Sequence, residues 1–240
     1  MNVLFVCTGN LCRSPMGELL AGAYLAGTSV TASSAGTLGL ASHVIDPNSA
    51  LVLEKARIVW NGDADASLPA CISPDAIAGF RSRRLTLDIA AGSDLILCFE
   101  KRQIEQVVTL CPSCVRRVFL LTRFARICSL CAERGLVTGW TVADRLRSII
   151  DESPLVMPLV QPAGDIADPI GQDLEHFKVV GWQTNQALHE IFSSLAQRKT
   201  RAVMDPGAAR HGRKETPGHD DAQRRLPAGI GQETTGNAAN

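Results

Sequence analysis

The sequence opens with Asn2-Val-Leu-Phe-Val-Cys7-Thr8-Gly9-Asn10-Leu11-Cys12-Arg13-Ser14-Pro15. Its first six residues form a continuous apolar run, which is typical of a strand buried on both faces of a parallel sheet. Thr8-Gly9-Asn10 predicts a turn. Ser14 and Pro15 suit the N-cap and first turn of a helix, which we expect to extend to about Ala26. The stretch therefore predicts a buried strand, a short loop and a helix.

The same alternation continues along the chain. We expect further strands at Val30–Ser34 (ending at Gly36), Asp94–Phe99 and Arg117–Thr122. Between and after them, the apolar spacing predicts helices at 49–57, 83–91, 101–110, 123–133, 142–150 and 172–197. Strands alternating with helices indicate a doubly wound α/β domain with a four-stranded parallel sheet and flanking helices.

Two stretches interrupt this pattern inside the domain, and a third follows it. Residues 61–79 are rich in Asp, Ala, Ser and Pro and are interpreted as a loop insertion, and a Pro-containing loop is expected from 154 to 169. Added length also falls at 128–162. From about Thr200 the apolar residues become isolated, so we predict an α/β domain at 1–199 and a disordered tail at 200–240.

Composition limits the function. Hydrophobic residues make up 45% of the 240 residues and charged residues 20%, as in a soluble globular protein. Because the 24 Lys and Arg balance the 24 Asp and Glu, the overall charge gives no sign of nucleic-acid or membrane binding. We find no bilayer-length apolar run and no signal peptide, and therefore expect a cytoplasmic protein whose eight cysteines are mostly not disulfide-bonded.

The loop from Cys7 to Ser14 carries the chemistry. Its backbone N–H groups can converge on one point as an anion nest, towards which the following helix directs its positive end. Arg13 can donate two hydrogen bonds to a phosphoryl group. The same positive field favours the ionised form of the Cys7 thiol, to which Ser14 can donate. Gly9 and Asn10 suit the tight backbone of such a nest.

Cys7 to Pro15 resembles the phosphate loop of the low-molecular-weight protein-tyrosine phosphatases, which also lies at the N-terminus. Ser34-Ala35-Gly36-Thr37 is similar to the segment after that family's second strand, and Asp168-Pro169 to its late Asp-Pro loop. The resemblance covers about Asn2 to Gln197. It implies a phosphatase that needs no cofactor or metal.

The resemblance also assigns roles. Cys7 is the expected nucleophile, Arg13 the stabilising cation and Asp168 the general acid, with Asp165 as a nearby alternative. The substrate-binding residues implied are Thr8, Gly9, Asn10, Leu11, Cys12 and Ser14. Cys12 is further expected to form a reversible, protective bond with Cys7.

The expected substrate is a phosphorylated protein or a small phosphate ester, and the expected state is a monomer or weak dimer without nucleic-acid or membrane partners. Phosphotyrosine-preferring members carry an aromatic residue after Asp-Pro, where this chain has Ile170. In the loop at 38–43, only His43 has a planar side chain, so an aryl ring would find little surface for stacking. Arsenate reduction with a small-molecule thiol, and an idle phosphate-binding module, are the alternatives.

Two C-x2-C pairs stand apart from the loop. Cys111 and Cys114 are separated by thirteen residues from Cys128 and Cys131, which is near the spacing of a zinc ribbon. The strand expected between them argues against that arrangement, because it would carry the pairs to opposite ends of the sheet. Zinc binding, thiol redox chemistry and simple packing all remain open for these cysteines.

Overall fold

The computed structural model describes residues 1–39, 41–55 and 72–196. Its sheet has four parallel strands in the order β2-β1-β3-β4. They are β1 (Asn2–Cys7), β2 (Thr31–Gly36), β3 (Leu95–Cys98) and β4 (Val118–Leu120). This confirms the predicted α/β fold. The chain leaves β1 for β2 on one side and later returns to β3 on the other, so the strand order reverses at β1, and ligands of such sheets bind beyond the carboxyl ends of the strands at this point.

The apolar run of β1 is buried on both faces. Phe5 and Cys7 face a core cluster that includes residues of α1, α6 and α8, whereas Leu4 and Val6 face a second cluster with residues of α5. β1 is central because it pairs with both β2 and β3, with Cys7 opposite Gly36 and Val6 opposite Cys98. The alternation explains why this strand contains no polar residue after Asn2.

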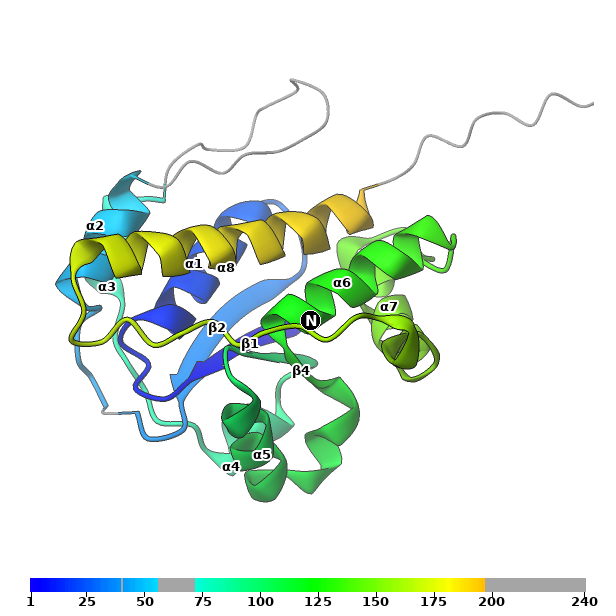
Figure 1. The fold of residues 1–240 in the computed structure, drawn as a ribbon, viewed down its shortest axis with the longest axis horizontal. Coiled ribbons are helices and arrows are strands. Elements are labelled where there is room, and N and C mark those ends of the chain that lie inside the picture. Colours follow the sequence, from blue (N-terminus) through cyan, green and yellow to red (C-terminus); the bar gives the residue numbers. More distant parts are fainter. Residues whose placement is uncertain (40, 56–71, 197–240) are drawn as a thin grey trace, which may run out of the picture. The chain divides into compact units, whose positions relative to one another are not determined.

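Helices cover both faces of the sheet, with α1, α6 and α8 on one side and α4 and α5 on the other (Figure 1). The elements outside the sheet are α1 (Arg13–Tyr24), α2 (Pro47–Lys55), α3 (Pro74–Gly79), α4 (Leu87–Ala91), α5 (Lys101–Leu110), the 3₁₀ helix η1 (Pro112–Arg117), α6 (Leu121–Glu133), α7 (Val142–Val156), the 3₁₀ helix η2 (Met157–Leu159) and α8 (Leu174–Leu195). Within the described ranges, no helix has both the length and the apolar character needed to cross a bilayer.

Two expected elements are shorter than the sequence pattern indicated. The helix expected at 83–91 begins only at Leu87, because Thr86 caps it by accepting a hydrogen bond from the Ile89 N–H at 3.3 Å. Arg84 instead forms an isolated parallel bridge with Gly36. The strand expected at 117–122 is only β4, since α6 already begins at Leu121.

The prediction that a Pro-containing loop begins at 154 was wrong about where the loop starts. Helix α7 continues through Pro154 to Val156, and η2 follows directly. Pro154 has no N–H to donate to the carbonyl of Ile150. The Ser153 hydroxyl donates to that oxygen instead, at 2.7 Å, so the helix continues without an unpaired acceptor. The added length at 128–162 is therefore largely helical.

The predicted insertion at 61–79 is partly outside the described residues. Its described end contains α3, where Ser73 accepts a hydrogen bond from the Asp75 N–H at 3.2 Å and Pro74 occupies the first turn. The expectation of a loop was wrong for this end, because a cap and an N-terminal proline together start a helix. The predicted tail at 200–240, and with it the domain boundary at 199, lies outside the described residues.

Candidate active site

The Cys7–Ser14 loop lies where β1 ends and α1 begins. α1 starts at Arg13, and Cys12 at its N-cap provides no side-chain hydrogen bond. The expectation that Ser14 is the N-cap was therefore wrong. Its hydroxyl oxygen lies instead 3.0 Å from the Cys7 Sγ. A serine in this position supplies a polar partner to a sulfur that is only 2% exposed.

Asn10 fixes the shape of the loop. It adopts a left-handed backbone conformation with φ of 56°, which Asn tolerates better than most residues. Its N–H donates to the Cys7 Sγ at 3.3 Å, and its buried side-chain amide donates to Ser14 Oγ at 2.9 Å and to Ser34 Oγ at 2.8 Å. The amide oxygen accepts from the Arg83 N–H at 2.8 Å. The left-handed residue is thus Asn10 and not Gly9, which the sequence had made an equal candidate.

Behind Asn10 the network continues to a buried carboxyl group. The Ser34 hydroxyl donates to Glu18 Oε2 at 2.6 Å, and Arg83 Nε donates to the Ser34 carbonyl at 2.6 Å. Burial raises the pKa of Glu18, although the Ser34 hydrogen bond and the Arg83 charge oppose the rise. Neither Glu18 nor Arg83 could be assigned a role from the sequence. Glu18 contacts Ser34 of β2, and Arg83, in the segment after α3, contacts Asn10 and Ser34 far from it along the chain.

β2 supplies one wall of the loop. The N–H of Thr37 donates to the Cys7 carbonyl and that of Leu38 to the Thr8 carbonyl, both at 2.9 Å. A Cβ on Gly36 would lie 2.7 Å from the Thr8 carbonyl oxygen and 2.9 Å from the Asn10 nitrogen. Only glycine therefore allows the end of β2 to approach the loop backbone so closely.

Arg13 lies beneath the loop with its side chain 1% exposed. Its Nη1 donates to Glu100 Oε2 at 2.7 Å and to the Ile166 carbonyl at 3.1 Å, and its Nη2 donates to Asp168 Oδ2 at 2.5 Å. The Nε is buried and has no hydrogen-bond partner among the described residues. A buried, unpaired N–H of this kind is costly, so it marks a position where an anionic acceptor would be stabilised.

The structure brings Asp168 to the loop and keeps Asp165 away from it. Asp165 accepts a hydrogen bond from the Lys101 N–H at 3.1 Å and is exposed. The carboxylate of Asp168 pairs with Arg13, and it also accepts from the Ile170 N–H at 3.3 Å. Of the two carboxylates considered, Asp168 is therefore the one that pairs with Arg13 of the loop.

Glu100 is a part of the site that sequence reasoning missed. Burial alone would raise its pKa, but the hydrogen bonds and charges of Arg13 and Arg102 outweigh burial and hold the pKa below its ordinary value. Gln103 contributes as well, since it donates to Glu100 Oε2 at 2.6 Å and to Thr8 Oγ1 at 3.3 Å. A pattern did exist in the sequence, because Glu100 follows β3 directly, at the same edge as Cys7.

Leu11 and Cys12 link the loop to the start of α2. The Leu11 carbonyl accepts from the Asp46 N–H at 3.0 Å. Burial raises the pKa of the Cys12 thiol to about 12, and the nearby charges of Asp46, Cys7 and Asp168 add to this effect. The Ser49 side chain opposes it through a hydrogen bond. Cys12 is therefore a protonated thiol close to Cys7.

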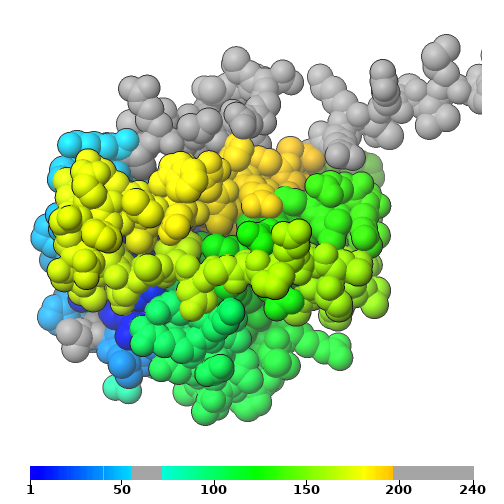
Figure 2. All heavy atoms as spheres, in the orientation of Figure 1, coloured from blue at the N-terminus to red at the C-terminus, as the bar shows by residue number. Residues whose placement is uncertain are grey.

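The described residues around the mouth of the loop are aliphatic. Leu38 follows β2 and is 63% exposed, and Ile170 follows the Asp-Pro pair and is 51% exposed. His43 is exposed and donates its backbone N–H to the Ser82 Oγ at 2.9 Å. On the face shown in Figure 2, residues of the N-terminal segment, in dark blue, are visible as a small area between the region of α5 and the segment before α8. The mouth thus offers apolar contact but little aromatic stacking.

The two C-x2-C pairs lie on opposite faces of the sheet. Cys111 and Cys114 belong to the core cluster with Leu4 and Val6, whereas Cys128 and Cys131 belong to the cluster with Phe5. Among the described residues, no group of three or more His, Cys, Asp or Glu could hold a metal ion. A zinc site shared by the four cysteines does not fit this topology. Cys98 shares the cluster of Cys111, on the face away from Cys7.

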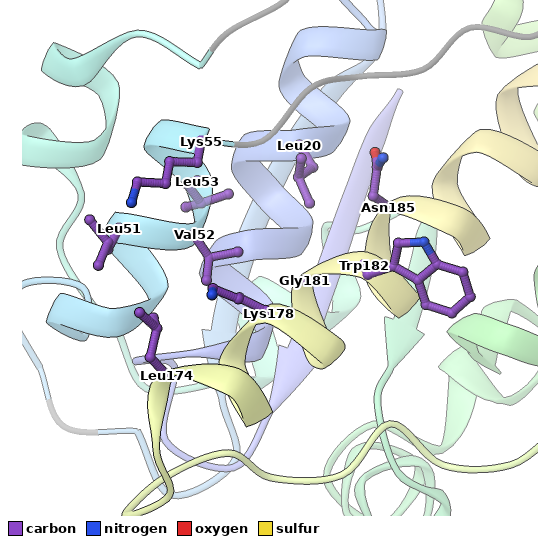
Figure 3. A pocket seen from close by; sticks show the side chains of 10 residues that line it. All are labelled: Leu20, Leu51, Val52, Leu53, Lys55, Leu174, Lys178, Gly181, Trp182 and Asn185. Atoms are coloured by element: carbon purple, nitrogen blue, oxygen red, sulfur yellow. The ribbon is translucent and has the colours of Figure 1, made fainter.

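A groove lies between α2 and α8, outside the Cys7–Ser14 loop. This groove of about 270 Å³ is mainly apolar, with Lys55 and Lys178 at its edge and Trp182 beside it (Figure 3). A Cβ on Gly181 would lie 2.6 Å from the Val52 side chain, so the glycine permits the close approach of the two helices. No residue of the loop contributes to the lining.

Known proteins provide the context for this geometry. Residues 2–71 match the family model described as low molecular weight phosphotyrosine protein phosphatase. The low molecular weight protein-tyrosine-phosphatase Etp of Escherichia coli is 36% identical over 111 residues, which cover 46% of this chain and 62% of Etp. The probable low molecular weight protein-tyrosine-phosphatase EpsP of Ralstonia nicotianae is 30% identical over 50% of this chain and 69% of EpsP.

A solved structure extends the likeness in fold. The low molecular weight protein tyrosine phosphatase from T. tengcongensis superposes with a TM-score of 0.55 at 22% identity, covering 81% of this chain and 99% of the other. At that identity the superposition supports the fold alone. The sequence match to Etp spans less than two thirds of that relative's length, and the family model matches residues 2–71 of this chain.

Proposed function

This chain belongs to the low-molecular-weight protein-tyrosine-phosphatase family, and we propose that it hydrolyses phosphate monoesters through a thiophosphate intermediate on Cys7. The observation that carries the proposal is the environment of one sulfur. Cys7 Sγ has Ser14 Oγ at 3.0 Å and the Asn10 N–H at 3.3 Å. The buried guanidinium of Arg13 belongs to the same loop, and its Nε is unpartnered within the described ranges.

In the first proposed step, the Cys7 thiolate attacks phosphorus and the bond from phosphorus to the ester oxygen breaks. Asp168 gives its proton to the departing oxygen, so that an alcohol or phenol leaves. The loop N–H groups and Arg13 hold the equatorial oxygens, where negative charge accumulates. The substrate contacts proposed come from Thr8, Gly9, Asn10, Leu11, Cys12 and Ser14, which line the loop with Cys7.

In the second proposed step, water attacks the phosphorus of the intermediate while Asp168 takes up its proton. The bond between sulfur and phosphorus breaks, which releases inorganic phosphate and restores the thiolate. Ser14 stabilises that thiolate by donating its hydroxyl hydrogen, and Asn10 keeps Ser14 in place through the 2.9 Å hydrogen bond. The cycle needs no metal or organic cofactor.

Substrate binding must rearrange Arg13. In the resting arrangement Nη2 is occupied by Asp168, and Nη1 by Glu100 and Ile166. A phosphate dianion that takes Nε and Nη2 would displace the Asp168 carboxylate towards the leaving-group oxygen. The freed carboxylate takes up a proton from solvent before it acts as the acid. Glu100 would keep its pair with Nη1 and hold the guanidinium in the plane that two phosphoryl oxygens require.

The test is hydrolysis of p-nitrophenyl phosphate by the full chain and by two variants. We expect Cys7→Ser to abolish turnover. Cys98→Ala is the matched control and should keep turnover. It removes a thiol that is as buried as that of Cys7 but lies on the neighbouring strand β3 and on the other face of the sheet. Equal activity in the wild type and in Cys7→Ser would refute the proposal.

The substrate class is proposed as phosphotyrosine protein or a small aryl phosphate. The exposed Leu38 and Ile170 support apolar contact with the substrate, without a stacking aromatic among the described residues of the mouth. We further propose a cytoplasmic monomer or weak dimer. The cytoplasmic location is supported by a mechanism that needs a reduced Cys7. We also propose that the chain does not bind nucleic acid, which is supported by the balance of 24 basic and 24 acidic residues.

A further inference from the structure

The Cys111-Pro-Ser-Cys114 turn stands at the opposite end of the sheet from Cys7. It forms the start of η1, which directly precedes β4, whereas Cys7 ends the parallel strand β1. The Cys114 N–H donates to the Cys111 carbonyl at 2.9 Å and closes the turn. The ends of such a turn lie less than about 7 Å apart between Cα atoms, which is within the range that a disulfide spans.

Polar donors surround both sulfurs. Ser113 Oγ lies 3.4 Å from the Cys111 Sγ. Arg117 Nη2 donates to the Cys114 Sγ at 3.3 Å and also to the Ala91 carbonyl at 3.1 Å, which fixes the guanidinium next to the pair. The Cys114 Sγ lies 3.4 Å from the Ala90 carbonyl oxygen, which is an alternative acceptor to the Cys111 sulfur for its single hydrogen. A cation and hydroxyl beside two adjacent thiols favour the thiolate form of one of them.

The two thiols are not equivalent. A hydrogen bond from the Cys114 side chain, followed by the Ser113 side chain and the Arg117 charge, lowers the pKa of Cys111 in spite of partial burial. Burial raises the pKa of Cys114, and the hydrogen bond to Cys111 adds to that effect. One thiol is therefore suited to attack and the other to resolve, as in a dithiol that exchanges disulfides.

Cys128 and Cys131 show that spacing alone does not create this asymmetry. Both lie inside α6, and burial raises the pKa of each thiol. The negative charge of Glu190 raises that of Cys128 further. No hydrogen bond from a positively charged side chain to either sulfur is recorded in the described part of the chain.

Access to the pair requires only a local movement. Cys111 is 1% exposed and Cys114 0%, but the residues between them, Pro112 and Ser113, are exposed, and Val115 is 59% exposed. The sulfurs thus lie one layer below the surface, under a two-residue turn. Opening that turn exposes Cys111 without disturbing the strands.

We propose that Cys111 and Cys114 are a dithiol that a low-molecular-weight disulfide oxidises reversibly, independently of Cys7. The Cys111 thiolate attacks one sulfur of the disulfide, which releases one thiolate and leaves a mixed disulfide on Cys111. Cys114 then loses its proton and attacks the Cys111 sulfur, which forms the internal disulfide and releases the second thiol. Two electrons pass from the protein to the small disulfide, and excess small thiol reverses both steps.

The experiment equilibrates the full chain carrying Cys7→Ser and Cys12→Ser with reduced and oxidised glutathione at varied ratios. After acid quenching, alkylation and trypsin digestion, mass spectrometry follows two peptides. Residues 103–116 contain Cys111 and Cys114, and residues 127–134 contain Cys128 and Cys131. At the oxidising ratios we expect the first peptide to carry no alkyl group and to have a mass two hydrogen atoms below that of the unalkylated dithiol. At the reducing ratios it should carry two alkyl groups again, while the second peptide stays fully alkylated throughout.

Variants separate the two steps. Cys114→Ser should stop the reaction at the first step and accumulate glutathione on Cys111. Arg117→Leu should slow oxidation by about tenfold relative to Arg116→Leu, which removes an exposed neighbour that does not contact the sulfurs. If peptide 103–116 remains reduced at every ratio at which the protein is folded, or if Cys114→Ser acquires no glutathione, the proposal is overturned.

Discussion

Replacing Asp168 by asparagine should weaken catalysis and, at the same time, tighten the binding of inorganic phosphate. In the resting site the Asp168 carboxylate occupies Arg13 Nη2 at 2.5 Å, so a phosphate ion has to displace it. The Asp168→Asn variant removes the charge of this competitor while keeping the size of the side chain. It also removes the only carboxylate that the proposed mechanism uses as an acid.

The size of both effects follows from the geometry. A buried charge-assisted hydrogen bond contributes about 1.5–3 kcal/mol, but an exposed ion pair contributes at most about 1 kcal/mol. Since the Asp168 side chain is 30% exposed and that of Arg13 only 1%, we take about 1 kcal/mol, which corresponds to about fivefold tighter phosphate inhibition. Loss of the general acid should lower kcat by about 10²–10⁴-fold, with the greater loss on phenyl phosphate, whose leaving group is poorer.

The assay measures kcat and the inhibition constant of phosphate for the wild type, for Asp168→Asn and for Asp165→Asn. Asp165 is the matched control, since it lies in the same segment but accepts from the Lys101 N–H instead of from Arg13. It should leave both constants nearly unchanged. The reasoning is refuted if phosphate inhibits Asp168→Asn no more tightly than wild type, or if kcat falls equally in both variants.

Three further predictions test the supports of the site. Gly36→Ala places a Cβ 2.7 Å from the Thr8 carbonyl oxygen, so we expect the free energy of unfolding in urea to fall by about 1–3 kcal/mol and kcat/KM to fall at least about tenfold. The control Gly22→Ala has nothing within 4 Å of the added Cβ and should stabilise α1 by about 0.5–1 kcal/mol. Equal effects of the two substitutions would contradict this. Because burial raises the pKa of Glu18, the unfolded chain releases that proton first as pH rises from the ordinary value, and wild-type stability falls in this window. Urea midpoints should therefore show Glu18→Gln gaining on wild type as the pH rises above the ordinary pKa of 4.5, and a constant difference would count against it. Since the Cys12 thiol lies near Cys7, peroxide-inactivated wild type should regain activity with dithiothreitol and Cys12→Ser should not. Full recovery of the variant would disprove the protective bond.

The sequence was informative where one segment makes both the structure and the chemistry. β1, the Cys7–Ser14 loop and α1 are contiguous, so the apolar run and the Cys-x5-Arg spacing predicted their arrangement directly. Asp168 could be found only through the family resemblance, because nothing local distinguishes it from Asp165. Their difference arises in three dimensions, where one carboxylate contacts Arg13 and the other caps the Lys101 N–H.

The remaining parts of the site depend on elements far apart in the sequence. Glu100 lies 87 positions from its partner Arg13, and Arg83 lies 73 positions from Asn10. Neither residue belongs to a recognisable motif. Glu100 acquires its role because parallel strands place their carboxyl ends at one edge of the sheet, and Arg83 because its segment bridges to the end of β2 at Gly36. Helix ends were missed for a simpler reason. The Ser153 hydroxyl pairs with the Ile150 carbonyl, so α7 continues past the boundary expected at Pro154, and Thr86 caps α4 later than the start expected at 83.

The two C-x2-C pairs show why spacing needs topology before it indicates a function. A zinc ribbon requires its four cysteines on one side of a short hairpin. Here β4 and the start of α6 stand between the pairs, and the pairs enter different core clusters. What then distinguishes them is a hydrogen bond from a guanidinium. Arg117 donates to Cys114, whereas within the described ranges no Lys or Arg side chain donates to Cys128 or Cys131, and Glu190 raises the pKa of Cys128. Identical spacing thus places one pair beside a cation in a surface turn and the other inside the buried face of α6.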